Sequence, residues 1–396
     1  MRRIVMIPLF LLLGLGFCFE PGGRWVRTGP VISRLSATTG KILLFGAPEG
    51  ISTLRLEEVG GGWTSEIRSE AENGDLRFEL EGLEPERRYR YRILDPHGSL
   101  LGRGMFRTAP RDGEGRVRFA AFGDSGGQPW FAYLSDSLGI RPVSWLADLL
   151  PGRGKQWDLA GILARREPDL VLHLGDVVYP WGKWEHYPEG YFLPFARILS
   201  GRPLVAAIGN HDALEHGAEP LLRMQGRDPR GVPRGNRYFD FAFGPVRFFC
   251  FDTITSSFEI GSPQIRWLRE RLALAREPWK VVFTHRPFWT SSRSRMDAAN
   301  RYLRDHVHPL LARYGVALVL SGHDHVYQRY RARDGVVYII SGAGGKSLYE
   351  LHEDPGLLRA EQVFGFLFVE AGPDSLVARA ETLEGRIVDR FRLTRP

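Results

Sequence analysis

Only two cysteines, Cys18 and Cys250, occur in this sequence of 396 residues. Because Cys18 ends an N-terminal segment that we expect to be removed, the chain has no intrachain disulfide framework. We expect Cys250, in the apolar run from Arg247 to Asp252, to be a small buried hydrophobe. With 43% hydrophobic residues, the chain is long enough to be stabilised by a large core divided over two domains.

Long apolar runs are also missing, since no stretch beyond the N-terminus approaches the roughly 18 residues of a membrane-spanning helix. Residues 1–20 begin with two arginines, continue with the apolar run from Ile4 to Phe17 and reach the first acid at Glu20. This layout is typical of a signal peptide and predicts a secreted or periplasmic protein. Lipid anchoring through Cys18 is the alternative, although lipoprotein signals favour a small residue where this chain has Phe17.

Lysine is scarce, because five of the 53 basic residues are lysines and the rest are arginines. The net charge is +7, but no run of five or six basic residues occurs. We therefore expect no specific nucleic-acid partner, and only a general attraction of anionic substrates. The sequence carries no signal for an oligomeric state.

Residues 21–112 consist of short β-like runs separated by glycine and proline, and their regular spacing predicts a β-sandwich. Leu83-Glu84-Pro85 followed by Tyr89 is similar to the turn and tyrosine corner of fibronectin type III domains. No cluster of acids, histidines or nucleophiles occurs in this region, so we expect it to have a structural role. The predicted strands are Lys41–Phe45, Ser52–Leu56, Leu76–Leu80 and Arg88–Ile93.

In residues 113–396, apolar strand-like runs alternate with helix-like segments, which predicts an α/β sheet covered on both faces. The aromatic segment 128–154 is expected to be either a packing insertion or a lid over a site. Four later runs are predicted to be strands that close the sandwich: Val336–Ile340, Gly365–Val369, Leu376–Ala380 and Ile387–Leu393. The predicted helices are Asp158–Arg166, Tyr191–Leu199, Pro263–Ala275 and Arg301–Tyr314.

Five predicted strands of this region each end in side chains that bind metals. Because ligand sites of open α/β sheets form outside the carboxyl ends of the strands, we expect the five clusters to converge. Glycines 123, 175, 209 and 322 precede the clusters, where we expect the backbone to turn sharply. Together the clusters favour a metal site over hydrogen-bonded core residues. The strands and their clusters are Val117–Phe122 with Asp124, Leu170–Leu174 with Asp176 and Tyr179, Leu204–Ile208 with Asn210, His211 and Asp212, Val281–Thr284 with His285, and Ala317–Leu320 with His323, Asp324 and His325.

These clusters resemble the five sequence blocks of the purple acid phosphatases, members of the calcineurin-like phosphoesterase superfamily. The blocks are Asp-x-Gly, Gly-Asp-x-x-Tyr, Gly-Asn-His-Asp/Glu, Val-x-x-His and Gly-His-x-His, and the likeness covers about residues 117–350. The resemblance implies an α/β plus all-β chain, with a fibronectin type III-like domain (21–112) before a four-layer α/β/β/α metallophosphoesterase core (113–396).

The resemblance also implies a two-metal centre. Asp124, Tyr179 and His325 would bind a first metal, normally Fe(3+), with Asp176 bridging to a second. Asn210, His285 and His323 would bind this second, divalent metal, which is Fe, Mn or Zn. Hard oxygen ligands suit the trivalent ion, and imidazole and amide ligands suit the divalent one. Tyr179 separates the purple subclass from other metallophosphoesterases, which lack a tyrosine ligand.

The implied reaction is in-line attack of a metal-bound hydroxide on a phosphate monoester. His211 is expected to contact the substrate and to protonate the leaving group. Asp212 is expected to orient His211 or another imidazole, or alternatively to cap a helix. Plant members of the family carry histidines about nine or ten residues after the Val-x-x-His block, whereas this chain has Arg293 and Arg295, which are either a phosphate clamp or solvated loop residues.

Two other functions remain open at this point. A phosphodiesterase or nucleotide hydrolase of the same superfamily would use the same ligands, so the sequence does not separate it from a phosphomonoesterase. A non-catalytic binding protein of the cell envelope is the second alternative, and the complete ligand set argues against it.

Overall fold

The computed structural model describes residues 28–127, 154–227, 237–292 and 297–395. The predicted signal peptide with Cys18, residues 128–153 of the aromatic insertion, and Arg293 and Arg295 lie outside the described residues. Within these four ranges, no helix has the length and apolar character needed to cross a membrane.

The N-terminal part is a β-sandwich of a three-stranded sheet (order β1-β2-β5) and a four-stranded sheet (order β4-β3-β6-β7). Alternate residues of β6, such as Tyr89, Tyr91 and Ile93, are buried between the two sheets. Tyr89 accepts a hydrogen bond of 2.8 Å from the backbone N–H of Glu84, which confirms the predicted tyrosine corner. The strands are β1 (Thr28–Leu35), β2 (Gly40–Phe45), β3 (Ile51–Glu58), β4 (Thr64–Glu70), β5 (Asp75–Leu80), β6 (Arg88–Leu94) and β7 (Leu100–Arg107).

The C-terminal part contains two further sheets packed face to face. The first is six-stranded (β10-β9-β8-β18-β19-β20) and the second seven-stranded (β11-β12-β13-β14-β16-β15-β17). Strands β8, β9 and β10 are mutually parallel in the first sheet, and β12, β13, β14 and β16 in the second. The strands are β8 (Val117–Phe122), β9 (Leu170–His173), β10 (Leu204–Ala206), β11 (Phe239–Phe243), β12 (Val246–Cys250), β13 (Trp279–Phe283), β14 (Leu318–Ser321), β15 (Tyr327–Tyr330), β16 (Val337–Ser341), β17 (Leu357–Glu361), β18 (Gly365–Ala371), β19 (Ser375–Thr382) and β20 (Ile387–Thr394).

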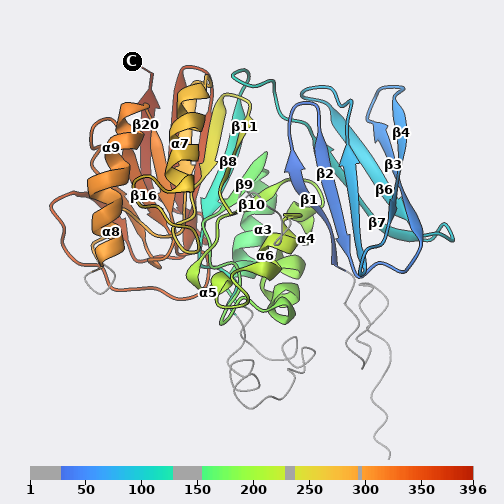
Figure 1. Ribbon diagram of the computed structural model, residues 1–396, viewed down its shortest axis with the longest axis horizontal. Coiled ribbons are helices and arrows are strands. Elements are labelled where there is room, and N and C mark those ends of the chain that lie inside the picture. The colour runs from blue at the N-terminus through green and yellow to red at the C-terminus, as the bar shows by residue number, and fades with distance from the viewer. Residues whose placement is uncertain (1–27, 128–153, 228–236, 293–296, 396) are drawn as a thin grey trace, which may run out of the picture.

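Helices cover the outer face of each sheet, so the predicted four-layer α/β/β/α core is confirmed (Figure 1). Between the sheets, the rings of Phe119 and Phe248 meet edge to face with centroids 5.1 Å apart. Helices α3 and α4 pack on the first sheet, and α7 and α9 on the second. The helices are α3 (Gln156–Arg166), α4 (Leu193–Leu199), α5 (Asn210–Ala213), α6 (Glu219–Met224), α7 (Pro263–Leu274), α8 (Ala298–Tyr302) and α9 (His308–Arg313), with π-helical turns at Pro188–Phe192 and Leu303–Val307.

One expectation about the core was wrong: the five site-bearing strands do not share one sheet with helices on both faces. β8, β9 and β10 belong to the first sheet, while β13 and β14 belong to the second. Each sheet has helices on one face and the other sheet on its second face, so its central strands are buried on both sides. Their continuous apolar runs are therefore the same as those of a single sheet between two helix layers.

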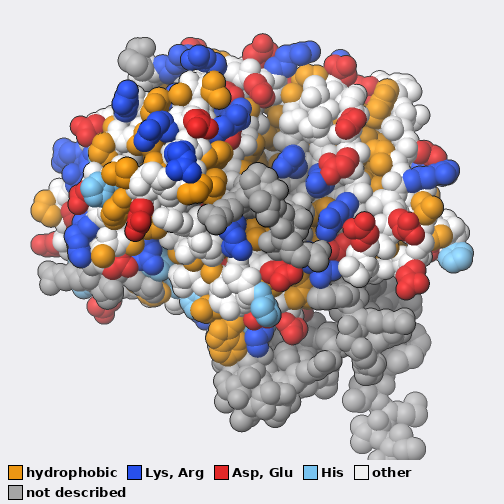
Figure 2. All heavy atoms as spheres, viewed as in Figure 1, with side chains coloured by type: hydrophobic (Ala, Val, Ile, Leu, Met, Phe, Trp, Pro, Cys, Tyr) orange, Lys and Arg blue, Asp and Glu red, His pale blue; other side chains and the backbone are white. Residues whose placement is uncertain are grey.

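The sandwich is attached to the helices that cover the first core sheet (Figure 1). Val31 and Phe45 of the sandwich are buried in the same cluster as Phe192 of the core. Asp75 of β5 forms a bidentate ion pair with Arg223 of α6, with both N–O distances 2.7 Å. On the face shown in Figure 2, acidic and basic side chains are interspersed over both domains.

Candidate metal centre

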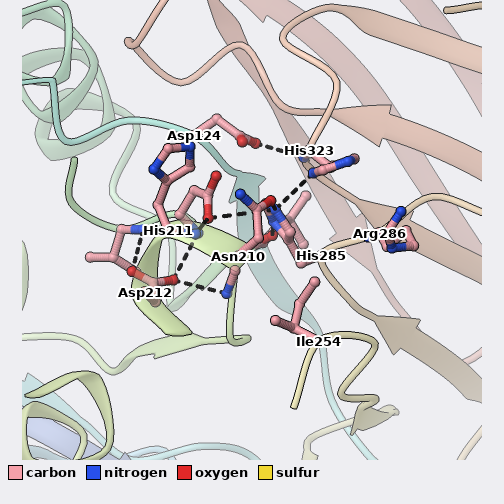
Figure 3. A network of polar contacts seen from close by, with 12 residues as sticks. Asp124, Asn210, His211, Asp212, Ile254, His285, Arg286 and His323 are labelled. Carbon is pink, nitrogen blue, oxygen red and sulfur yellow. Dashed lines mark hydrogen bonds and ion pairs between the residues drawn. The ribbon is translucent and has the colours of Figure 1, made fainter. Parts of the chain in front are cut away.

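The seven predicted metal ligands come together at the carboxyl ends of the parallel strands of both core sheets. Figure 3 shows Asp124, Asn210, His285 and His323 pointing toward one another. Asp124, Asp176 and His285 are buried, and one ligand atom of each lies within 4.8 Å of those of the others. The expected convergence of the five clusters therefore occurs, although the strands come from two sheets.

A first group of donor atoms surrounds the hydroxyl of Tyr179. This oxygen lies 3.1 Å from Oδ1 of Asp124, 3.0 Å from Oδ2 of Asp176 and 3.2 Å from Nε2 of His325. A phenol has a single proton to donate, so it cannot donate to both carboxylates at once. The group therefore gathers oxygen and nitrogen donor atoms of three other side chains around one hydroxyl.

A second group surrounds Nε2 of His285. It lies 3.0 Å from Oδ1 of Asn210, 3.2 Å from Nδ1 of His323 and 3.6 Å from Oδ1 of Asp176. Nδ1 of His285 lies 2.8 Å from the carbonyl oxygen of Leu174. Because a carbonyl only accepts, Nδ1 carries a proton and donates it to Leu174, and Nε2 faces the oxygens of Asn210 and Asp176.

Asp176 belongs to both groups through different oxygens. Its Oδ2 faces the Tyr179 hydroxyl of the first group, and its Oδ1 faces the His285 imidazole of the second. One carboxylate thus lies between two sets of donor atoms, one around each of its oxygens.

The two aspartates of these groups are buried. Among the described residues, no lysine or arginine forms an ion pair with Asp124 or Asp176, and both are at most 2% exposed. Burial, and to a lesser extent the charge of Asp176, raises the pKa of Asp124 well above its usual value. Burial and then the charges of Asp124 and Asp176 also raise the pKa of Tyr179, so the phenolate needs a cation to form. The donor atoms fit two metal ions, an oxygen-rich position around Tyr179 and an imidazole and amide position around His285.

The backbone at this centre is held in conformations that non-glycine residues rarely adopt. The φ angles are +60° for Asp124, +54° for Asp176 and +71° for His323. Each costs on the order of 1 kcal/mol, a strain that is typical of functional sites.

The sequence predicted sharp backbone turns at the glycines that precede the ligands. Gly175 confirms this prediction, since its φ is +89°. Gly209 and Gly322 are needed for a different reason, because ligand side chains approach them closely. A Cβ at Gly209 would lie 2.1 Å from Oδ1 of Asp176, and one at Gly322 would lie 2.6 Å from Oδ2 of Asp124.

Among the described residues, the side-chain partners of Asp212 are backbone groups and not an imidazole, which differs from one of the two roles expected for it. Its buried carboxylate accepts hydrogen bonds from the backbone N–H groups of Asp176, Val177 and Gly209, at 2.8, 3.0 and 2.9 Å. The bond from Gly209 caps α5, which is the second role predicted for Asp212. The other two bonds hold the turn that carries Asp176. Burial, followed by the charge of Asp176, raises the pKa of Asp212 to about 8.

His211 lies beside the centre, with its ring centroid 4.4 Å from that of Tyr179. Its Nδ1 lies 2.5 Å from the carbonyl oxygen of Pro180, so Nδ1 carries the proton and Nε2 is left for other partners. Its backbone N–H donates to Oδ1 of Asp176 at 2.8 Å. The imidazole of His211 is therefore held by the loop that follows Tyr179. The backbone of His211 in turn holds the Asp176 carboxylate, which the two groups share.

Two supporting contacts were missed in the sequence. Strand β12 overlaps the apolar run noted around Cys250, and Thr253 beyond its end is bonded to Thr284 Oγ1 and to the backbone N–H of Arg286, both at 3.0 Å. Ser347 lies 2.7 Å from Nδ1 of His325 through its hydroxyl. Neither segment contains a histidine or a Gly-Asp pair, so only the three-dimensional contacts reveal them.

The chain is similar in sequence to one protein family and to known acid phosphatases, and similar in fold to solved structures. Residues 117–327 match the calcineurin-like phosphoesterase family. The human tartrate-resistant acid phosphatase type 5 is 25% identical over 315 residues, which cover 70% of this chain and 91% of that protein. The purple acid phosphatase PPD1 from seeds of yellow lupin (Lupinus luteus) has a similar fold, with a TM-score of 0.77 over 92% of this chain and 74% of that one, at 18% identity. PhoD is also similar in fold, with a TM-score of 0.65, 14% identity and coverage of 92% of this chain and 88% of that one.

Proposed function

Because the chain belongs to the calcineurin-like phosphoesterase family and is an enzyme of the purple acid phosphatase type, we propose that it hydrolyses phosphate monoesters at a centre of two metal ions. The observation that supports two ions rather than one is the position of Asp176. Its Oδ2 lies 3.0 Å from the Tyr179 hydroxyl and its Oδ1 3.6 Å from Nε2 of His285, as a bridging carboxylate requires.

In this proposal, Asp124, Tyr179 and His325 hold Fe(3+), and Asn210, His285 and His323 hold a divalent Fe, Mn or Zn ion. When bound, the two ions supply an activated water for in-line attack and neutralise charge on the phosphate. The carboxylate and phenolate oxygens suit the trivalent ion, and the nitrogens and the amide oxygen suit the divalent one.

The residues around the ions have separate tasks. The Nδ1 proton of His211 is directed at the Pro180 carbonyl, so Nε2 is the nitrogen that faces a substrate and delivers a proton to the leaving oxygen. Asp212 acts through the backbone, because its three hydrogen bonds keep Asp176 in place. Arg293 and Arg295 remain candidates for binding the phosphate.

We assign residues 21–112 to a fibronectin type III-like domain and residues 113–396 to the catalytic domain. Residues 1–20, with their two arginines and apolar run, are proposed to direct export, so that the enzyme acts outside the cytoplasm.

Comparing p-nitrophenyl phosphate with its bis ester tests the proposed substrate class. A higher kcat/KM for the monoester supports a phosphomonoesterase, whereas a strong preference for the diester would favour the phosphodiesterase alternative. Less than one equivalent of bound metal per chain, with no turnover of either ester, would favour the non-catalytic binding protein.

A further inference from the structure

Strand β10, which leads to the predicted ligand Asn210, lies at the edge of the first core sheet. Among the described strands it pairs with β9 alone, whereas β8, β9, β13 and β14 each have a neighbouring strand on both sides. It is also short, with three residues from Leu204 to Ala206. Because the outer edge of a strand leaves backbone groups without a ladder partner, β10 needs other support to hold Asn210 in place.

The side chain of Gln225 takes the place of a neighbouring strand on this edge. Its Oε1 accepts a hydrogen bond of 3.1 Å from the backbone N–H of Ala206, and its Nε2 donates one of 3.1 Å to the carbonyl oxygen of Leu204. One side-chain amide thus makes the contacts that the peptide groups of an adjacent strand would make. Because Gln225 is 4% exposed and Ala206 is buried, removal of the amide would leave polar groups of β10 unsatisfied.

Arg227 adds one more bond to the same edge. Its Nη2 donates to the carbonyl oxygen of Ala206 at 3.1 Å and lies 3.4 Å from Oε1 of Gln225. Its guanidinium also lies over the ring of Phe239 in β11, 3.9 Å from the centroid, so it joins the edges of the two core sheets. Both the N–H and the carbonyl oxygen of Ala206 are therefore bonded to side chains that follow α6.

Helix α6 fixes the position of Gln225, which directly follows the end of the helix. The backbone N–H of Gln225 donates to the carbonyl oxygen of Leu221 at 3.0 Å. Leu221 and Leu222 are buried in the same hydrophobic cluster as Ala206. The ion pair of Arg223 with the sandwich attaches this helix to the N-terminal domain. The Gln225 amide is therefore presented to β10 from a backbone that packing and hydrogen bonds hold in place.

The position of β10 bears most directly on the second group of donor atoms. Asn210 begins α5, shortly after the end of β10. Its Oδ1 lies 3.0 Å from Nε2 of His285, whose strand β13 belongs to the other sheet. A shift of β10 would therefore change the distance between these two side chains. Asp124 and Asp176 follow β8 and β9, which are interior strands, so such a shift should affect the first group less.

We propose that Gln225 is a positioning residue for Asn210 and thereby for the divalent metal of the centre. The inference rests on the proposed function and concerns the same centre. Gln225 acts through the backbone of β10, because its amide holds the outer edge of the strand that leads to Asn210. Loss of the amide should weaken the divalent-metal position and leave the iron position around Tyr179 in place.

The test compares the wild type with Gln225→Met, which keeps the side-chain volume without the amide, and Gln225→Glu, which keeps the acceptor for the Ala206 N–H. Thr108→Val is the matched control, because the buried hydroxyl of Thr108 forms hydrogen bonds with the backbone of the sandwich. The free energy of unfolding, the visible band of the iron-bound tyrosinate and the Kd of Zn(2+), after removal of the divalent ion, are measured for each protein. Amide exchange of residues 204–211 is followed in the metal-free protein and does not depend on metal binding.

We expect Gln225→Met to bind Zn(2+) about tenfold more weakly than the wild type, as is typical when a residue that supports a metal ligand is lost. Its visible band should persist, and the amides of residues 204–211 should exchange faster. Gln225→Glu should lose only about threefold in Zn(2+) affinity, because it keeps one of the two hydrogen bonds and Arg227 balances its charge. Thr108→Val should lose stability but bind Zn(2+) as tightly as the wild type.

Wild-type Zn(2+) affinity in Gln225→Met would overturn the proposal, and so would loss of the visible band together with Zn(2+). Equal losses of Zn(2+) affinity in Gln225→Met and Thr108→Val would show that general instability is the cause. If Gln225→Met does not fold, Gln225→Glu decides, and Zn(2+) affinity equal to that of the wild type contradicts the role of Gln225. If the wild type binds fewer than two metal ions, the proposed function fails; exchange of residues 204–211 that is no faster in the variants then overturns the inference on its own.

Discussion

The backbone N–H of Asp176 donates a hydrogen bond of 2.8 Å to Oδ2 of Asp212, which lies 36 residues later in the chain. This bond links the turn after β9 to the short helix after β10, and each of these carries a predicted metal ligand. Asp212 is buried and accepts two more backbone hydrogen bonds, so its carboxylate fixes the relative positions of Asp176 and Asn210.

Replacing Asp212 by alanine should therefore weaken metal binding without removing a ligand. Three backbone N–H groups would lose their acceptor, and the turn that carries Asp176 would relax. We expect metal affinity to fall about 10- to 100-fold, as measured by competition with a chelator. Asp212→Asn, which keeps one acceptor oxygen, should lose less.

Asp95→Ala is the matched control, because Asp95 also accepts two backbone N–H bonds, but in an exposed turn of the sandwich. It should leave metal affinity unchanged. Equal losses in Asp95→Ala and Asp212→Ala would mean that general instability, and not the Asp176 turn, lowers the affinity.

The same carboxylate should make the metal-free protein less stable as the pH rises. Burial raises the pKa of Asp212 to about 8 in the folded chain, compared with about 3.9 in an unfolded one. Between these values the folded state holds a proton that the unfolded state releases, so this contribution is complete below about pH 4 and is lost as the pH approaches 8. Bound metal ions favour the ionised form and should reduce the effect.

Urea unfolding of chelator-treated wild type and Asp212→Asn at pH 5 and pH 7.5 measures this contribution. We expect the wild type to lose more unfolding free energy between the two pH values than the variant, which has no titrating group at position 212. A wild type that gains stability relative to the variant over this window would contradict the predicted direction.

Gly209 should not tolerate a side chain, although its backbone conformation would allow one. Its φ is −96°, but a Cβ would lie 2.1 Å from Oδ1 of Asp176. Gly209→Ala should therefore displace the carboxylate and lower metal affinity at least about tenfold. Gly62→Ala, at a glycine with open space around its Cβ position, should match the wild type; if Gly209→Ala also matches it, Asp176 does not occupy a bridging position.

Loss of His211 should affect substrates according to their leaving groups. A proton donor matters most for a basic leaving group such as phenol, and least for p-nitrophenol. We expect His211→Ala to lower kcat for phenyl phosphate about 100-fold, and to lower it much less for p-nitrophenyl phosphate. His216→Ala, at an exposed histidine of the same segment, is the control; an equal loss on both substrates would indicate that His211 binds substrate without donating a proton.

Much of this centre could be predicted from the sequence because its ligands lie in the loops that follow buried strands. Asp124, Asp176 and His285 needed only the strand ends and the rule that ligand sites form at carboxyl edges. The division into two sheets could not be predicted, because strands buried between a helix layer and a second sheet have the same apolar runs as strands buried between two helix layers.

Other parts escaped prediction because their signals are weak or their partners are distant. Strand β4 is at the edge of its sheet, and its residues are all partly or fully exposed, so it has no buried apolar face to detect. Lys346 and Ser347 follow no apolar strand pattern and reach Tyr179 and His325 only through the fold. Asp212 could be picked out because it belongs to the Gly-Asn-His-Asp block. Its hydrogen bonds to the backbone of the Asp176 turn could not be predicted, because they join residues about 35 positions apart in the sequence.

The central claim is a two-metal centre in which Tyr179 binds ferric iron, and it is tested most directly by metal analysis with a visible spectrum. Protein purified without chelator should contain two metal ions per chain and show the charge-transfer band of an iron-bound tyrosinate, with a purple or pink colour. Tyr179→Phe should lose the band, because no other described tyrosine hydroxyl is bonded to Asp124 or Asp176. A colourless wild type that is fully loaded with metal, or a Tyr179→Phe protein that keeps the band, would contradict the account.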